Sequence, residues 1–497
     1  MGTLSLILPP KDVVAIGDTL FGHMKENINK KALLHYTLAL NSVTKSAANK
    51  LIPLIPKLLP FILKDIEDRI NKDADDFDAQ NELIDYYLSI IDAFIKKSHK
   101  EVTPYLNAIL QQLPQLICYD PNCVVNFDAD NAMDVENEEE KGDFWDEEDD
   151  FDSEDSSWRV RRGAIRLTET FIRLRPELLK DLTEHVIEKV VKCFKDKDTN
   201  IKLDVFSCLN AYLESVTVSD KKADELHEDI MVEVIALNRL KSSYQDIGST
   251  ISYMIKQLTK LFSDPKNPTV AASQLLLSAA HCVSSNVMEQ WTTVFQTIQK
   301  TFNHSSSPNE LKVNMLIALR RLLRAQIGKP YPQVAGDYKA ILEVVNEAIT
   351  TNTYFKISSE GFRVLSTFLR VLRPSLKESP SNYASYVKPI VPIVISRLKE
   401  TDIDQEIKNA IIASVSVLIS YFGDAIESTS LNAIFQQILI KLKSEVTRVQ
   451  TLKALSSLPV AELKLSINVK VLVFLSEINH FFQLIERISR SIGTNRI

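Results

Sequence analysis

Expected helices with a basic residue near their start recur along this chain at intervals of about 40 residues. Each opening has an apolar residue and then Lys or Arg, after an acidic or polar turn. The basic residues are Arg161, Lys202, Lys312, Lys356, Lys408 and Arg448. From Arg161 to Lys202 the interval is 41 residues, from Lys312 to Lys356 it is 44, and from Lys408 to Arg448 it is 40. A period of this length predicts stacked two-helix units that bury their apolar sides against one another.

Inside these units the apolar residues are spaced as in helices, and the alternation typical of strands is scarce. The sequence therefore predicts an all-α fold, an α-solenoid of the HEAT or armadillo type built from antiparallel helix pairs. The basic marker is missing between Lys202 and Lys312. We expect one divergent unit there, opening near Val270 and Ala271, and a loop around residues 219–228.

Two features of the helix starts have a physical role in such a stack. Asp198 and Asp404 stand just before a helix, where a carboxylate oxygen can accept a backbone N–H that has no partner within the helix. The basic residue that opens each helix can pair with the turn carboxylate of the next unit. We therefore predict a ladder of ion pairs along the stack, formed by Arg161, Lys202, Lys312, Lys356, Lys408 and Arg448.

An acidic run interrupts the array. Residues 128–155 hold sixteen Asp or Glu residues against the single Lys141. Such a segment cannot bury enough apolar surface to fold, so we interpret it as a disordered, solvated insert. Without it the chain has 57 basic and 49 acidic residues, so a basic scaffold carries an acidic insert. This asymmetry favours charged partners.

The run also sets the predicted organisation. We expect N-terminal HEAT-like repeats over residues 1–127, the acidic flexible loop over 128–157, further HEAT repeats over 158–463, and an atypical C-terminal tail over 464–497. The loop has two interpretations, a solubilising insert without a specific partner or a segment that docks on a basic surface. Aromatic residues within the acidic stretch favour docking. The predicted docking residues are Phe144, Trp145, Asp146, Glu147, Glu148, Asp149, Asp150 and Phe151.

The motifs of enzymes and cofactor-binding proteins are missing from the sequence. The eleven glycines are scattered, and neither a phosphate-binding loop nor a dinucleotide fingerprint occurs. The histidines are isolated, and Cys118 and Cys123 have no second pair to complete a zinc site. We predict a protein that is not an enzyme and takes no cofactor or metal.

Two clusters of arginine, at 159–166 and 320–324, are interpreted as solvated helix faces or as part of the ladder rather than as a nucleic-acid surface. The longest apolar-looking stretch, residues 51–63, contains three prolines and is too short to span a bilayer. The unpaired spacing of the cysteines favours a reducing compartment. We expect a monomeric scaffold in the cytoplasm and nucleus, without membrane or nucleic-acid partners.

Several short motifs in series resemble one family. The acidic run leading into Ser157-Trp158-Arg159-Val160-Arg161-Arg162 is followed by Asn200-Ile201-Lys202-Leu203-Asp204-Val205-Phe206 and by Tyr354-Phe355-Lys356-Ile357-Ser358-Ser359-Glu360. Further along stand Asp402-Ile403-Asp404-Gln405-Glu406-Ile407-Lys408 and Leu442-Lys443-Ser444-Glu445-Val446-Thr447-Arg448. In this order they resemble the cullin-associated NEDD8-dissociated (CAND) proteins, and the chain corresponds to a central portion of them.

The resemblance implies a HEAT superhelix that binds an unneddylated cullin with its RING-box protein and takes part in SCF complex assembly and substrate-receptor exchange, without catalysis. Compared with the family, we expect this chain to lack several opening repeats and roughly the whole second half. A karyopherin-like transport receptor is the alternative, since such receptors are also HEAT arrays with an acidic loop.

Overall fold

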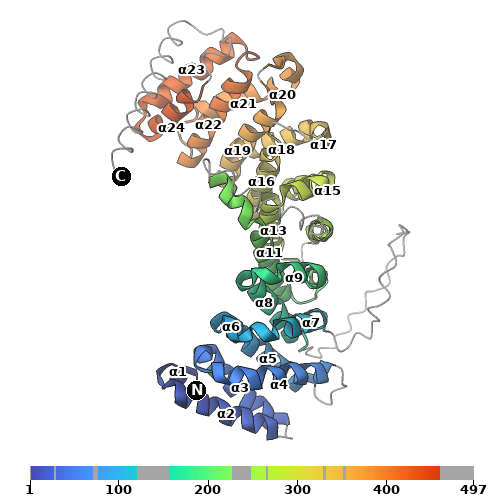
Figure 1. The fold of residues 1–497 in the computed structure, drawn as a ribbon. Coiled ribbons are helices and arrows are strands. Elements are labelled where there is room, and N and C mark those ends of the chain that lie inside the picture. The colour runs from blue at the N-terminus through green and yellow to red at the C-terminus, as the bar shows by residue number, and fades with distance from the viewer. Residues whose placement is uncertain are drawn as a thin grey trace, which may run out of the picture. The chain divides into compact units, whose positions relative to one another are not determined.

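The computed structural model describes residues 2–26, 30–70, 77–119, 156–225, 248–264, 267–327, 332–350, 354–375 and 377–458. Every regular element in these ranges is a helix (Figure 1). The predicted all-α, HEAT-type α-solenoid is confirmed. The chain forms two compact units, Met1–Thr250 and Ile251–Ile497, and each is described by itself.

In the first unit the helices pack in two layers. The first layer contains α3 (Lys30–Ala47), α5 (Phe77–Lys97), α8 (Trp158–Leu174) and α11 (Thr199–Glu225), each packed on the next. The second layer contains α4 (Ile55–Ile70), α7 (Leu106–Ile117), α9 (Leu179–His185) and α10 (Ile187–Lys192). The N-terminal helices α1 (Gly2–Ile7) and α2 (Pro10–Glu26) pack on α3, and the one-turn helix α6 (His99–Val102) follows α5.

The second unit repeats this arrangement. Its first layer contains α13 (Thr269–Cys282), α16 (Asn309–Arg324), α19 (Phe355–Leu372), α22 (Gln405–Phe422) and α24 (Glu445–Ser456). Its second layer contains α14 (Ser284–Glu289), α15 (Trp291–Asn303), α17 (Pro332–Gly336), α18 (Tyr338–Thr350), α20 (Ala384–Val387), α21 (Ile390–Lys399) and α23 (Ser428–Lys443). Residues 251–261 are also helical and precede α13. The apolar core lies between the two layers.

The predicted helix starts of the first layer agree with the structure. The carboxylate of Asp404 accepts a hydrogen bond from the backbone N–H of Glu406 at 2.7 Å, and that of Asp198 accepts one from the N–H of Asn200 at 2.6 Å. The divergent unit expected near Val270 begins with α13 at Thr269. The loop expected at residues 219–228 is wrong over its first part, because α11 continues to Glu225. Residues 219–225 carry almost no apolar side chain, but they contain two lysines, an alanine and a glutamate, which favour a helix by intrinsic propensity.

One buried arginine links neighbouring repeats at the end of α19. Both terminal nitrogens of Arg373 reach the carboxylate of Asp424, which follows α22, at 2.8 and 2.9 Å. The guanidinium also donates to the carbonyls of Glu378 and Tyr421. Only 1% of Arg373 is exposed. A two-pronged pair of this kind fixes both distance and orientation, so it sets how the C-terminal ends of α19 and α22 stack.

Candidate functional site: charged ridges and a groove

In the first unit a charged ridge runs across three neighbouring first-layer helices. Arg162 and Arg166 of α8 both donate to the carboxylate of Asp204 on α11, at 2.7 and 2.9 Å. On the other side of α8 stands Asp85 of α5. We call Asp85, Arg162, Arg166 and Asp204 the first ridge. The side chain of Arg166 is 55% exposed, so it remains available to a partner.

The position of Asp85 depends on a close approach between α5 and α8. A methyl group at Gly163 would lie 3.0 Å from Leu88 Cδ1 and 3.2 Å from a carboxylate oxygen of Asp85. Burial raises the pKa of Asp85, and the neighbouring positive charges of Lys45 and the α8 arginines oppose that rise. The first ridge therefore alternates acid, base and acid from one helix to the next.

A second ridge crosses the first layer of the other unit. Glu360 of α19 pairs with Arg320 of α16 and, at 3.0 Å, with Arg363 one turn further on. The other terminal nitrogen of Arg363 reaches Glu406 of α22 at 2.7 Å. We call Arg320, Glu360, Arg363 and Glu406 the second ridge. The Glu360 side chain is only 3% exposed and Arg363 is 45% exposed, so a buried acid holds two arginines at the surface.

Of the six predicted ladder residues, Arg161 makes the expected pair. Its Nε lies 2.8 Å from the carboxylate of Asp196, in the turn before the next first-layer helix. Its Nη1 also donates to the carbonyl of Tyr119 at 3.1 Å and to the hydroxyl of Ser157 at 2.6 Å. Tyr119 and Ser157 lie on either side of residues 120–155. Arg161 thus joins the two ends between which the acidic run is inserted.

The other predicted ladder residues make different contacts. Lys312 lies over the ring of Phe302 and Lys356 over the ring of Phe355, each 5.8 Å from the centroid. Arg448 donates to the carbonyls of Leu442 and Lys443 at 3.4 and 3.2 Å, at the end of α23, where a helix favours positive charge.

Two predicted ladder lysines remain to be placed. Lys202 stands in the first turn of α11, and its backbone N–H donates to the carbonyl of Asp198. The charge of Lys408 lies near Lys441, whose pKa is lowered first by burial and then by Lys408. Many pairs that link neighbouring first-layer helices are therefore formed not by the opening basic residue but by arginines deeper in each helix. The arginines at 162, 166 and 320, which the sequence predicts to belong to a solvated face or to the ladder, lie in the ridges.

The predicted docking residues of the acidic run, Phe144, Trp145, Asp146, Glu147, Glu148, Asp149, Asp150 and Phe151, lie outside the described residues, as does the tail 464–497. The described residue next to the run is Ser156. Its hydroxyl bonds to Asn81 at 2.9 Å and to Asp78, which anchors the start of α8 to α5.

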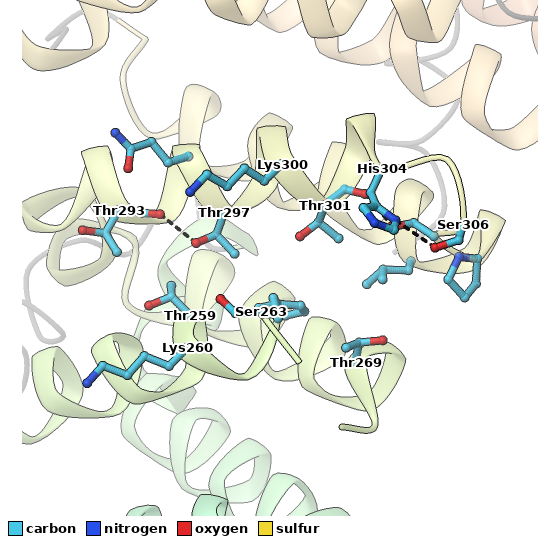
Figure 2. A pocket seen from close by; sticks show the side chains of 15 residues that line it. Thr259, Lys260, Ser263, Thr269, Thr293, Thr297, Lys300, Thr301, His304 and Ser306 are labelled. Atoms are coloured by element: carbon cyan, nitrogen blue, oxygen red, sulfur yellow. Dashed lines mark hydrogen bonds between the residues drawn. The ribbon is translucent and has the colours of Figure 1, made fainter. Parts of the chain in front are cut away.

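A groove lies in the second unit, between residues 251–261 and α15 (Figure 2). Its volume is about 720 Å³. Thr293, Thr297 and Thr301 form a row on α15 and face Thr259 and Ser263 across the opening (Figure 2). Lys260 and Lys300 extend toward one end, and His304 and Ser306 lie at the other (Figure 2). Sequence reasoning missed this groove, although threonine at every fourth position of residues 293–301 was a visible signal.

The described residues contain no group of three or more His, Cys, Asp or Glu side chains placed to hold a metal ion. Burial raises the pKa of the Cys118 thiol and, more strongly, that of Cys193, to about 12. Buried thiols of this kind are poor nucleophiles, because little thiolate forms near neutral pH. In the part of the chain described, no single helix is long and apolar enough to cross a membrane. One pair of helical segments, Lys31–Lys50 with Ile52–Ile70, has the length and composition of a membrane span when taken together, but the pair is bent by 111°.

Two layers of stacked helix pairs, with charged ridges along one layer, define this chain as an α-solenoid of the HEAT type, a class whose members work by binding other proteins along an extended surface. Within that class, the family described as "CAND1-like, TPR repeats" matches residues 285–415. The resemblance to the CAND family predicted from the sequence is confirmed.

Curated relatives extend the match over most of the chain. Cullin-associated NEDD8-dissociated protein 1 of Drosophila melanogaster is 26% identical over 459 residues, which are 90% of this chain and 34% of the relative. The protein of the same name from Arabidopsis thaliana is 25% identical, and the match covers 82% of this chain and 32% of the relative. Cullin-associated NEDD8-dissociated protein 2 of Rattus norvegicus is 25% identical, and the match covers 86% of this chain and 32% of the relative. The chain thus spans about a third of the length of the curated relatives it matches.

Among solved structures, the crystal structure of Kap121p is similar with a TM-score of 0.45 and 14% sequence identity, covering 90% of this chain and 38% of that one. Kap95p in its complex with RanGDP is similar with a TM-score of 0.45 and 13% sequence identity, and the match covers 91% of this chain and 55% of that one.

Proposed function

We propose that this chain is a non-catalytic scaffold that binds an unneddylated cullin with its RING-box protein and regulates the assembly of SCF-type ubiquitin ligases and the exchange of their substrate receptors. The observation that carries the proposal is the match to cullin-associated relatives over 90% of the chain. In this proposal the protein acts as a monomer in the cytoplasm and nucleus, without cofactor, metal, nucleic-acid or membrane partners.

The ridges support a binding role and supply the contact surface. Arg166 and Arg363 are about half exposed while their inner neighbours hold them in place. Arginines positioned in this way lose little side-chain entropy when a partner carboxylate approaches. We therefore assign the cullin contact to the first layer of each unit.

A pull-down with purified cullin–RING pairs tests the proposal. The full chain should retain the unmodified cullin and not the neddylated form. Equal recovery of both forms would contradict the assignment. A GTP-dependent complex with a Ran-type GTPase, in place of cullin capture, would instead support the karyopherin-like alternative.

Charge reversal tests the assigned surface. Arg166→Glu together with Arg363→Glu should weaken cullin binding by about tenfold or more, since like charges then face the partner. Lys388→Glu with Lys339→Glu, two exposed second-layer changes in one unit, is the matched control. Equal effects of the two double variants would remove the ridges from the interface.

The acidic run has a separate role in this proposal. We infer that its aromatic residues Phe144, Trp145 and Phe151 anchor it on a basic surface, either on a partner or on the chain's own repeats. Its carboxylates speed the encounter with that surface through long-range electrostatic attraction. Deletion of residues 136–155 should weaken partner binding at low salt more than at high salt. Unchanged affinity at both salt concentrations would leave only the solubilising interpretation.

A further inference from the structure

The groove between residues 251–261 and α15 differs from the ridges in its charge balance. In the ridges each arginine is paired with a carboxylate. The groove is lined by Lys260, Lys300 and His304, and no Asp or Glu is among its lining residues. Within the described residues neither lysine has an ion-pair partner. The positive charge gathered here is therefore not balanced locally.

The groove also offers hydrogen-bond donors. Thr259 and Thr297 bond to backbone carbonyls of their own helices, at 3.0 and 2.8 Å. The hydroxyls of Ser263, Thr269 and Thr293, by contrast, form no hydrogen bond with any described residue. Free hydroxyls beside lysines suit carboxylate oxygens, which act only as acceptors.

The length of the groove and its apolar lining favour an extended peptide segment over a small ligand. Gln290 donates to the carbonyl of Ser252 at 2.7 Å and ties the two walls together at one end. Beyond this tie the groove follows α15 from Thr293 to His304, which is about 16 Å at the rise of a helix. That length accommodates about five residues of an extended peptide. Of the two apolar residues at the groove, Phe262 adds surface for one nonpolar side chain, whereas Leu311 is only 3% exposed.

We propose that this groove binds an extended acidic segment of a partner protein, rich in Asp and Glu and carrying one apolar or aromatic anchor. Carboxylates lie beside Lys260 and Lys300, backbone carbonyls accept from the free hydroxyls, and the anchor rests near Phe262. The site lies along α15, a second-layer helix, whereas the second ridge of the same unit lies on first-layer helices. It does not depend on the identity of that larger partner.

Fluorescence anisotropy with the full chain tests the proposal. The probe is a labelled synthetic peptide of alternating Asp and Glu with one central Phe, and the matched peptide has Asn and Gln in place of the acids. The acidic probe should bind, the amide probe should not, and binding should fall between about 0.05 and 0.5 M NaCl. Equal binding of both probes overturns the proposal.

Two variants locate the binding. The double variant Lys260→Glu with Lys300→Glu should lower the affinity for the acidic probe by about tenfold or more. The control pair Lys339→Glu with Lys388→Glu should change this affinity little. Thr293→Trp keeps the net charge and fills the groove, so it should weaken the probe as well. Loss with both charge-reversed pairs, or no loss with Thr293→Trp, would show diffuse attraction to a basic surface and overturn the site.

A phosphorylated probe separates two sources of negative charge. In it, two phosphoserines replace two acids of a chain that otherwise carries Asn and Gln. Binding of this probe together with failure of the carboxylate probe would assign the groove to phosphate and overturn the acidic-segment proposal. Binding of the carboxylate probe that inorganic phosphate does not displace supports it.

Discussion

At the scale of single residues, packing is tightest where glycine allows two helices to meet. A methyl group at Gly361 in α19 would lie 2.8 Å from Ala348 Cβ and 3.0 Å from Ile349 Cγ2 of α18. Helix α19 contacts both α18 in the second layer and its neighbours in the first. The absence of a side chain at this position is therefore a requirement of the two-layer stack.

Gly361→Ala should destabilise the second unit by about 1–3 kcal/mol, because the added methyl forces α18 and α19 apart. Gly336→Ala is the matched control, since a methyl group there meets nothing within 4 Å and improves helix propensity. Urea unfolding followed by circular dichroism measures both. A neutral Gly361→Ala variant would show that the two helices are free to separate.

The cysteines allow a prediction from pKa. Burial raises the pKa of Cys193 to about 12 and strongly raises that of Cys208, so neither forms thiolate at pH 8. Cys118 and Cys282 are partly exposed. Among these four described cysteines, mass spectrometry after alkylation under native conditions at pH 8 should show Cys118 and Cys282 labelled before the other two, and Cys193 and Cys208 only after denaturant is added. Rapid native labelling of Cys208 would contradict its position in the core.

At the scale of helices and their connections, apolar burial holds the stack together, and a few buried arginines fix how neighbouring repeats meet. Arg373 holds Asp424 with two hydrogen bonds and closes the end of the α19 and α22 pair. Arg373→Met removes the charge but keeps much of the volume, and leaves Asp424 and two carbonyls without their donor. We expect a loss of about 2–4 kcal/mol.

Chemical denaturation measures this loss, with Arg370→Met, an exposed arginine on the same helix, as the control. Arg373→Lys should recover only part of the stability, because an ammonium cannot form the planar two-pronged pair. Full recovery by lysine would mean that charge alone matters at this position.

Arg161 acts between elements in another way, through Asp196, Tyr119 and Ser157. Arg161→Ala should destabilise the first unit by about 2–3 kcal/mol, since the pair with Asp196 is largely buried. Arg159→Ala, which removes a cation lying over the Trp158 ring, should cost less than about 1 kcal/mol. Hydrogen exchange of α8 and α11 after each substitution distinguishes the two. Equal protection in both variants would contradict the special role of Arg161.

At the scale of the whole molecule, the layered arrangement was predictable because its causes are local. Helix caps such as Asp404, and apolar residues at helical spacing, act within one or two turns, and so they appear directly in the sequence. The repeat period then follows from counting. The family resemblance added the expected kind of partner.

The identity of the residues that pair between repeats was harder to predict. Arg161 and Arg162 are adjacent, yet they point in directions about 100° apart around the helix, and one meets Asp196 while the other meets Asp204. Which of them meets which neighbour depends on the offset between stacked helices, which no local rule provides. The groove depends likewise on the separation of two helices that are not consecutive in the sequence.

The bonds of Arg161 to Tyr119 and Ser157 have an evolutionary consequence. Because the guanidinium fixes the distance between these two positions, the repeats on either side keep their register whatever number of residues stands between Tyr119 and Ser157. Descendants of such a gene are thus free to lengthen, shorten or rewrite that stretch without disturbing the register on either side.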